Sequence, residues 1–235
     1  MFNLRSSRDR GHGQFRWLEA RHSFSFADYY DPNHVHWGPL RVLNEDRIAG
    51  GGGFPAHPHR DMEIITWVLE GQLTHQDSTG GRETITPGEI QRMSAGTGIT
   101  HSEFNASASE PVHLLQIWLL PGRPGIKPGY EQKRMMIRPD GLTLLAAPDA
   151  RDGAVNIHQD ADIWVARLNP GDQTQLRPKA RGRLQWLQVA KGELSLNGQR
   201  LEQGDGAAIA QEDVLTLKGL APAEALIFDM APLPL

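Results

Sequence analysis

Two short motifs in this sequence could hold a metal ion. His57-Pro-His59 and His101-Ser-Glu103 each place two ligand-type side chains two residues apart. In a β-strand, residues two positions apart point to the same face, with their Cα atoms ~6.5–7 Å apart. Two such strands lying side by side would bring together three imidazoles and one carboxylate. That donor set suits Fe, Mn, Ni, Co, Cu or Zn and excludes none of them.

The residues around both motifs suit a site at the open end of a strand pair. Four glycines at 50–53 precede the first motif, and Gly96 and Gly98 precede the second. Glycine permits tight turns and a close approach of the backbone. Pro58 lacks an N–H, so its strand is expected at a sheet edge, where a ligand can enter. Either motif alone is typical of a polar strand face, but the two together favour metal binding.

Glu63 has several interpretations. It is in phase with His57 and His59 if their strand has no bulge. It would then be a fifth ligand, or it would accept a hydrogen bond from an imidazole N–H. The alternatives are a surface carboxylate or a salt-bridge partner of Arg60.

The remaining histidines are expected to be structural. His113 shares its strand parity with apolar residues, which predicts a histidine of the core. His75 lies in the polar run at 74–78, which predicts a solvated or turn residue. His34 and His36 follow an Asp-Pro-Asn segment and are expected on the surface.

The composition excludes several classes of chemistry. The 235 residues include no cysteine, which removes disulfides, thiolate metal sites and cysteine nucleophiles. The net charge is −4 without a long basic run, so phosphate-driven nucleic-acid binding is disfavoured. No apolar run could span a membrane and the N-terminal segment has no signal-peptide core, so we expect a cytoplasmic protein. Nucleophile elbows, phosphate loops and dinucleotide fingerprints are also absent from the sequence.

The apolar pattern predicts an all-β protein. Short apolar or alternating runs recur between clusters of Gly, Pro, Asn and Asp, without a long 3.6-residue period. The runs around Gly71 and Gly192 resemble each other, as do those around Gly88 and Gly204. We therefore predict two related antiparallel β-barrels in tandem, joined within the Pro- and Gly-rich segment 121–148.

The second barrel is expected to lack metal ligands. The turn glycines align the two halves and place other residue types at the motif positions. In this alignment the counterparts of His57, His59, His101 and Glu103 are Pro178, Ala180, Leu217 and Gly219, respectively. The second barrel would then be a structural or regulatory partner of the first.

Four segments resemble one known family. They read HSFSFADYYDP at 22–32, FPAHPHRDME at 54–63, LEG at 69–71 and MSAGTGITHSE at 93–103. Together they are similar to the pirin family of the cupin superfamily, and above all to its bacterial pirin-like quercetin 2,3-dioxygenases. The resemblance covers almost the whole chain and is strongest over residues 10–132.

The resemblance implies a bicupin, two jelly-roll barrels in one chain. Residues 1–132 would form an N-terminal metal-binding cupin barrel, and residues 133–235 a C-terminal cupin barrel that lacks metal ligands. One divalent transition metal, iron in the best-known relatives, would be bound, although Mn, Co, Ni, Cu and Zn suit the same donors. Its ligands would be His57, His59, His101 and Glu103. Because Glu103 supplies the carboxylate in this family, Glu63 is left as a hydrogen-bond acceptor near the imidazoles.

Two functions are compatible with this resemblance. The first is a metal-dependent dioxygenase that opens the heterocyclic ring of flavonols such as quercetin with O2 and releases carbon monoxide. Glu103 would accept the 3-hydroxyl proton as general base, and the metal would hold the oxyanion. Phe24, Phe54, Met93 and Phe104 are expected to form an apolar mouth for the planar substrate. The alternative is a non-enzymatic regulator or redox sensor that binds a protein partner, and in either case we expect a monomer.

Overall fold

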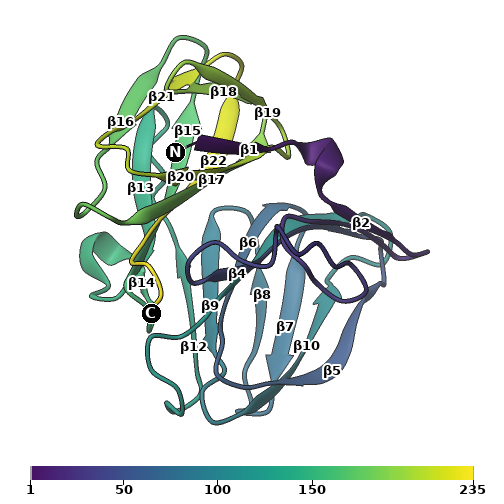
Figure 1. Ribbon diagram of the computed structural model, residues 1–235. Helices are drawn as coiled ribbons and strands as arrows, with labels where there is room; N and C mark the ends of the chain where they lie inside the picture. The colour runs from purple at the N-terminus through teal and green to yellow at the C-terminus, as the bar shows by residue number, and fades with distance from the viewer. Residues whose placement is uncertain (1, 235) are drawn as a thin grey trace.

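The computed structural model describes residues 2–234, and strands dominate this part of the chain. Two 3-10 turns, η1 (Ser7–Asp9) and η2 (Arg151–Gly153), supply its helical segments, and no helix in it is long and apolar enough to cross a membrane. The strands form an N-terminal and a C-terminal half, each with a seven-stranded and a four-stranded sheet (Figure 1). The predicted all-β, tandem jelly-roll architecture is confirmed. The two sheets of each half face each other and do not close into one continuous barrel.

The N-terminal half holds both motifs, in its four-stranded sheet. In spatial order that sheet contains β5 (Gly53–His59), β10 (Ile99–Asn105), β7 (Leu73–Asp77) and β8 (Arg82–Ile85). The facing sheet contains β12 (Gly129–Arg134), β9 (Glu89–Ser94), β6 (Glu63–Glu70), β11 (Val112–Leu119), β4 (Leu40–Ile48), β3 (Leu18–His22) and β2 (Gly11–Gln14).

The C-terminal half repeats this arrangement. Its seven-stranded sheet contains β1 (Phe2–Arg5), β20 (Gly206–Ala210), β17 (Leu184–Lys191), β22 (Ala223–Met230), β15 (Ala161–Leu168), β13 (Gly141–Ala147) and β14 (Val155–Asn156). Its four-stranded sheet contains β16 (Gln173–Leu176), β21 (Leu215–Gly219), β18 (Glu193–Leu196) and β19 (Gln199–Glu202). The β13–β14 pair is parallel, whereas the other pairs described here are antiparallel.

The two halves exchange an edge strand. β1, at the start of the chain, pairs with β20 in the C-terminal half. β12, which comes directly before the strands of the C-terminal half in sequence, pairs with β9 in the N-terminal half. The two strands occupy corresponding edges of their sheets. The exchange ties the halves together by backbone hydrogen bonds as well as by side-chain packing.

An apolar core joins the halves. It includes Trp67 of β6 and Trp186 of β17, and Phe24 packs on Trp186 with ring centroids 4.9 Å apart. Trp67 Nε1 also donates to Glu224 Oε1 across the boundary, at 2.7 Å. The N-terminal seven-stranded sheet therefore presents one face to the other half and its opposite face to the motifs.

β5 is an edge strand, as Pro58 predicts. A Cβ atom on Gly53 would lie only 2.6 Å from Phe104 Cα, so the close approach of β5 to β10 needs glycine. The register between these strands shifts between His101 and Glu103, which marks a bulge or irregularity. The motifs therefore lie at a locally distorted sheet edge.

Candidate metal centre

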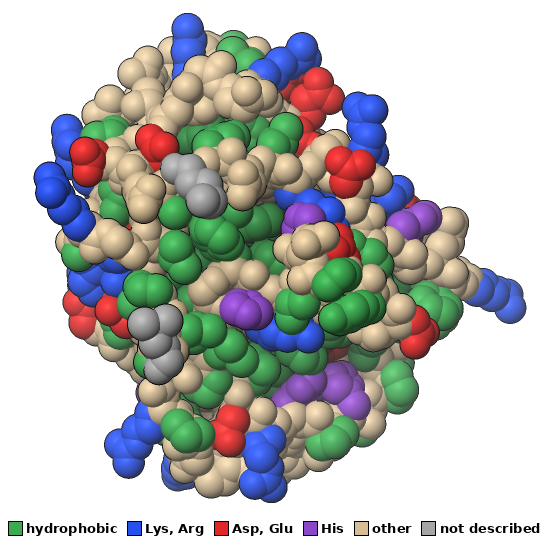
Figure 2. All heavy atoms as spheres, in the orientation of Figure 1, with side chains coloured by type: hydrophobic (Ala, Val, Ile, Leu, Met, Phe, Trp, Pro, Cys, Tyr) green, Lys and Arg blue, Asp and Glu red, His purple; other side chains and the backbone are tan. Residues whose placement is uncertain are grey.

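The three motif histidines converge. β10 pairs with β5 so that His101 lies directly opposite His57, and His59 follows two residues along β5. The Nε2 atoms of His57 and His101 are 3.0 Å apart, and the three ring centroids lie 4.5–4.8 Å from one another. Figure 2 shows histidine side chains gathered on the lower, N-terminal half, with hydrophobic side chains beside them. Strand register thus joins two motifs that are more than forty residues apart in sequence.

Glu103 lies next to this cluster. Its carboxylate groups most closely with ring nitrogens of His101 and His75, within 4.8 Å. Its Oε2 accepts a hydrogen bond from Gln116 Nε2 at 2.8 Å, whereas the buried Oε1 has no partner among residues 2–234. Burial raises the pKa of Glu103 to about 7, despite opposing hydrogen bonds from Gln116 and Thr66. One carboxylate oxygen is therefore fixed and the other is available.

The environment of the imidazoles favours the neutral form, whose lone pair can bind a metal. Burial and the neighbouring imidazoles lower the pKa of His101 to about 2 and that of His59 to about 4. His57 Nδ1 lies 2.8 Å from the Pro55 carbonyl oxygen, which can only accept. Nδ1 of His57 therefore carries the proton, and the lone pair on Nε2 faces His101. Neutral imidazole with an exposed lone pair is the form that binds metals.

The donor set fits a divalent transition metal. His59 Nε2 and Glu103 Oε1 are buried, and neither has a hydrogen-bond partner in the described part of the chain. Buried polar atoms without partners cost free energy, and coordination of a cation would remove that cost. The two residues belong to different candidate ligand groups, which share His101. Three neutral imidazoles and one carboxylate would leave a divalent ion with a net positive charge, which attracts an anionic ligand.

The interpretation of His75 as a solvated or turn residue was wrong. His75 lies in the centre of the four-stranded sheet, is fully buried, and sits opposite Glu103 in the β7–β10 register. Its Nε2 bonds to Asp77 Oδ2 at 2.9 Å, and its Nδ1 lies 3.4 Å from His101 Nδ1. The polar run around it misled the prediction, because alternation in β7 turns the imidazole inwards while its neighbour Gln76 stays exposed.

Glu63 lies outside both groups of potential metal ligands and forms no ion pair with Arg60 among the described residues. It is 1% exposed, and its Oε2 accepts from the backbone N–H of His158 at 3.0 Å, with His158 Nδ1 at 3.4 Å. Glu63 does bond an imidazole, but one from the C-terminal half, so it joins the halves.

The predictions for the other histidines largely hold. His113 is buried and its Nε2 bonds Glu45 Oε1 at 2.9 Å, which confirms a satisfied core histidine. His36 is exposed, as expected. His34 is half-buried, because its Nδ1 bonds Asp31 Oδ2 at 2.8 Å.

Most of the expected apolar mouth is not at the site. Phe24 lies in the core between the halves, Phe54 packs edge-on against Trp17, and Phe104 is 41% exposed because it points away from the inward-facing residues of β10. Met93 does belong to an apolar cluster that borders the histidines. The expectation is therefore wrong for the three phenylalanines.

Two aromatic residues that the sequence analysis missed line the site instead. Trp118 packs edge-on against His59 with ring centroids 4.9 Å apart, and Tyr130 packs against His75 at 4.8 Å. Both belong to the same apolar cluster as Met93. Gln116, a lone polar residue in an apolar strand, was the available signal, because Trp118 shares its strand face.

The C-terminal half has no comparable cluster in the described chain, and strand pairing corrects the predicted alignment by two residues. The true counterparts of His57, His101 and Glu103 are Leu176, Leu215 and Leu217. The connecting loops differ in length, which the glycine alignment could not reveal: His57 and Thr66 are nine residues apart, and their counterparts Leu176 and Leu187 are eleven apart. The C-terminal half thus carries leucines at these three positions.

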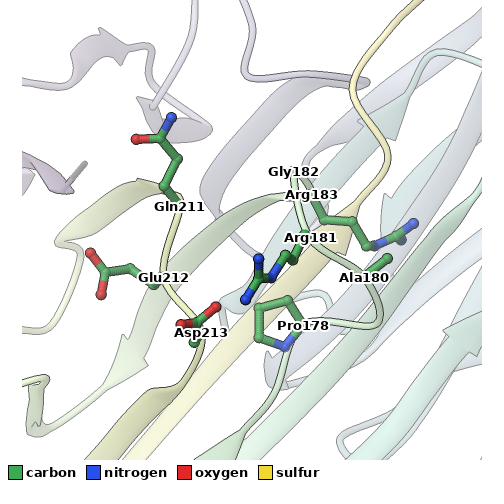
Figure 3. A pocket seen from close by; sticks show the side chains of 8 residues that line it. All are labelled: Pro178, Ala180, Arg181, Gly182, Arg183, Gln211, Glu212 and Asp213. Atoms are coloured by element: carbon green, nitrogen blue, oxygen red, sulfur yellow. The ribbon is translucent and has the colours of Figure 1, made fainter.

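A hollow of about 540 Å³ in the C-terminal half is a different kind of site. Figure 3 shows that two loops, 178–183 and 211–213, supply its side chains. Arg183, the most buried cation there, already bonds Asp229 Oδ2 at 2.9 Å and Asp160 Oδ1 at 3.0 Å. No imidazole lines this hollow, so it does not repeat the chemistry of the N-terminal half.

Two jelly-roll halves in tandem, with a potential metal centre in the N-terminal one, define a bicupin. The pirin family profile matches residues 3–119, and the profile of the quercetinase C-terminal cupin domain matches residues 144–230. The chain belongs to the pirin family.

Individual relatives agree with this assignment. A protein of Escherichia coli K12 described as quercetin 2,3-dioxygenase is 46% identical over 232 residues, which cover 99% of this chain and 100% of the relative. The crystal structure of YhhW from E. coli superimposes with a TM-score of 0.96 at 45% identity and covers 99% of both chains. A second structure, described as the bacterial pirin YhhW in complex with nickel(II), gives a TM-score of 0.94, also at 45% identity, and covers 99% of this chain and 100% of its own. The pirin family is thus shown, and one similar protein holds a metal.

Proposed function

We propose that this chain is a metal-dependent dioxygenase that opens the heterocyclic ring of flavonols such as quercetin, consuming O2 and releasing carbon monoxide. The observation that carries the proposal is the convergence of three imidazoles beside a buried carboxylate with one free oxygen. The relative described as quercetin 2,3-dioxygenase supports the reaction, and the nickel(II) complex of a similar protein supports the metal.

The metal ligands proposed here are His57, His59, His101 and Glu103. When bound, a divalent transition metal supplies a Lewis acid for the oxyanion of the flavonol 3-hydroxyl. Glu103 accepts the proton of that hydroxyl, while Gln116 holds its Oε2 in place.

One side of the site offers an aromatic wall for a flat substrate. An open hollow of about 410 Å³ beside His59 has a mixed lining that includes Ile99, Arg60 and Ser78. Trp118 packs on His59 from another side, and its buried Nε1 has no partner among residues 2–234. That N–H can donate to a flavonol oxygen once the ring lies against the indole.

Iron as the native metal, a monomeric state and a cytoplasmic location stay predictions from the sequence. The decisive experiment measures O2 uptake and carbon monoxide release with quercetin. The apoprotein is loaded in turn with Fe, Mn, Co, Ni or Cu at measured occupancy. His57→Ala and Glu103→Gln are compared with Asp172→Asn, which changes a turn carboxylate of the C-terminal half.

We expect turnover with at least one metal and equal activity in Asp172→Asn. His57→Ala should lose most of its metal and its turnover, whereas Glu103→Gln should keep some metal and lose turnover. Full occupancy without turnover for every metal would contradict the enzyme proposal and favour the regulatory alternative. Unchanged turnover in Glu103→Gln would exclude Glu103 as the essential base.

A further inference from the structure

His75 and Asp77 form a chain of contacts that ends at a proposed ligand. Asp77 Oδ2 lies 2.9 Å from His75 Nε2, and His75 Nδ1 lies 3.4 Å from His101 Nδ1, at the long end of the hydrogen-bond range. His101 Nε2 in turn faces His57 Nε2 at 3.0 Å. The side chains of His75 and Asp77 are completely buried, so water does not compete for these contacts.

The direction of each hydrogen bond follows from the carboxylate. Asp77 Oδ1 accepts from the backbone N–H and the hydroxyl of Thr79. These bonds and the one from His75 outweigh burial and hold the pKa of Asp77 below its usual value. An ionised carboxylate only accepts, so the proton of the pair lies on His75 Nε2. A neutral imidazole carries one proton, so His75 Nδ1 keeps a lone pair that faces His101 Nδ1.

We propose that Asp77 and His75 are positioning residues that lock His101 in the tautomer required for metal binding. The lone pair on His75 Nδ1 can only accept, so His101 bonds to it by carrying its proton on Nδ1. The lone pair of His101 Nε2 then points at His57, whose own Nε2 lone pair is fixed through the Pro55 carbonyl. Two lone pairs face each other at 3.0 Å, an arrangement that a cation stabilises. The inference rests on the metal centre proposed above and identifies what prepares it.

Asp77→Asn tests this series of contacts and leaves the shape of the side chain almost unchanged. The Thr79 N–H requires an acceptor at the Oδ1 position, so the amide nitrogen of Asn must take the Oδ2 position and donate to His75 Nε2. The proton of His75 then moves to Nδ1 and points at His101 Nδ1. His101 is left with its proton on Nε2, where it blocks the metal.

Two measurements detect this exchange of tautomers and its effect on metal affinity. Two-bond ¹H–¹⁵N spectra of histidine-labelled apoprotein should show His101 as the Nδ1–H tautomer, and as the Nε2–H tautomer in Asp77→Asn. Calorimetric titration with Ni²⁺ should show an affinity about 10–100-fold lower in Asp77→Asn, the usual effect of disturbing a partner of a metal ligand. Asp172→Asn is the matched control and should leave both unchanged.

His75→Leu supplies the second variant. Leucine occupies the corresponding position of the C-terminal half, Leu196, so the fold accommodates it there. His75→Leu should also weaken Ni²⁺ binding, and adding Asp77→Asn to it should cost nothing further. If the two substitutions lowered the Ni²⁺ affinity additively, Asp77 would not act through His75 and the proposal would be overturned.

The outcomes separate this inference from the metal centre. An unchanged His101 tautomer and Ni²⁺ affinity in Asp77→Asn, with binding lost in His57→Ala, would refute the positioning role alone. Unchanged Ni²⁺ binding in His57→Ala would refute the centre itself. A coordinated His75 Nδ1 in the spectrum of the Zn²⁺-loaded protein would make His75 a ligand and also overturn the proposal.

Discussion

The two halves of this molecule place opposite chemistry at equivalent positions of the same scaffold. Four inward-facing residues of the N-terminal half are ionisable, and all four counterparts are buried leucines. The pairs, defined by strand register, are His57 and Leu176, His75 and Leu196, His101 and Leu215, and Glu103 and Leu217. The jelly roll therefore folds with an apolar interior, and the histidines are not needed to build it.

The contrast extends into the facing sheet. Thr66 and Gln116, which support Glu103, correspond to Leu187 and Ile227 in the C-terminal half. The buried carboxyl of Asp46 corresponds to Ala166. Burial and the nearby charge of Glu103 raise the pKa of Asp46 to about 7, and its Oδ1 has no partner among residues 2–234. The N-terminal interior thus gives up stability for a polar site, as functional sites commonly do.

The two halves also differ at the position of Trp118. Trp118 beside the histidines corresponds to Asp229 in the C-terminal half. Asp229 accepts from Arg183 Nε at 2.9 Å and from Gln185 Nε2 at 2.9 Å, and the Arg183 side chain is 6% exposed. A buried ion pair with both partners hydrogen-bonded therefore occupies the position at which the other half carries an aromatic side chain beside its histidines.

Among the substitutions that test this comparison, Leu217→Glu should have the largest effect on stability. It places the N-terminal carboxylate in a C-terminal interior where leucines and Ile227 replace the imidazoles and Gln116. Loss of apolar packing and burial of an unpaired carboxyl should lower the free energy of unfolding by about 4 kcal/mol or more at pH 8. Denaturant unfolding measures it, with exposed Lys218→Glu on the same strand as control. A loss below about 1 kcal/mol would show that the apolar interior tolerates charge.

Glu103→Gln removes the carboxylate from its native position in the N-terminal half. The folded apoprotein raises the pKa of Glu103 from 4.5 to about 7, so between these values the folded state binds more protons than the unfolded chain. The stability of the wild-type apoprotein should therefore fall as the pH rises through this window, by at most about 3 kcal/mol from this group. Removing the ionisable group should flatten that fall.

The measurement is urea unfolding of both apoproteins between pH 5 and pH 8. His59 and His101, whose lowered pKa values favour the opposite slope at acidic pH, are present in both proteins and cancel in the difference. Asp46 remains in both proteins, but its own fall should be smaller in Glu103→Gln, because the charge of Glu103 is one cause of its raised pKa. Parallel curves for the two proteins would contradict a raised pKa at Glu103.

Metal binding should sharpen the difference between the halves. At a free Ni²⁺ concentration of 100 Kd, the protein should gain about 2.7 kcal/mol of stability. Hydrogen exchange should localise part of this gain to β5, β7 and β10, because the candidate ligands and their partners lie there. β16, β18 and β21 serve as the internal control. Equal protection of both four-stranded sheets would argue against a centre confined to the N-terminal half.

The sequence predicts the fold and three members of the cluster because short-range patterns encode them. The repeated apolar runs indicate strands, and the spacing of His57, His59 and His101 survives as a strand face. His75 could not be placed, because its burial depends on a pairing of β7 with β10 that no local pattern reveals. Trp118 was hidden in an apolar run, where only long-range packing distinguishes a site wall from core.

Glu63→Gln carries the smallest expected effect and tests how the halves are joined. The glutamine oxygen can still accept from the His158 N–H, but the bond is no longer charge-assisted, so we expect a loss of about 1 kcal/mol in unfolding free energy. Glu70→Gln, on the same strand, removes an exposed ion pair with Lys191 and should cost less than about 0.5 kcal/mol. Both variants should bind Ni²⁺ as tightly as wild type, because neither glutamate belongs to a candidate ligand group. A weaker Ni²⁺ affinity in Glu63→Gln alone would instead connect the metal centre to the C-terminal half through His158, and the division of roles between the halves would no longer hold.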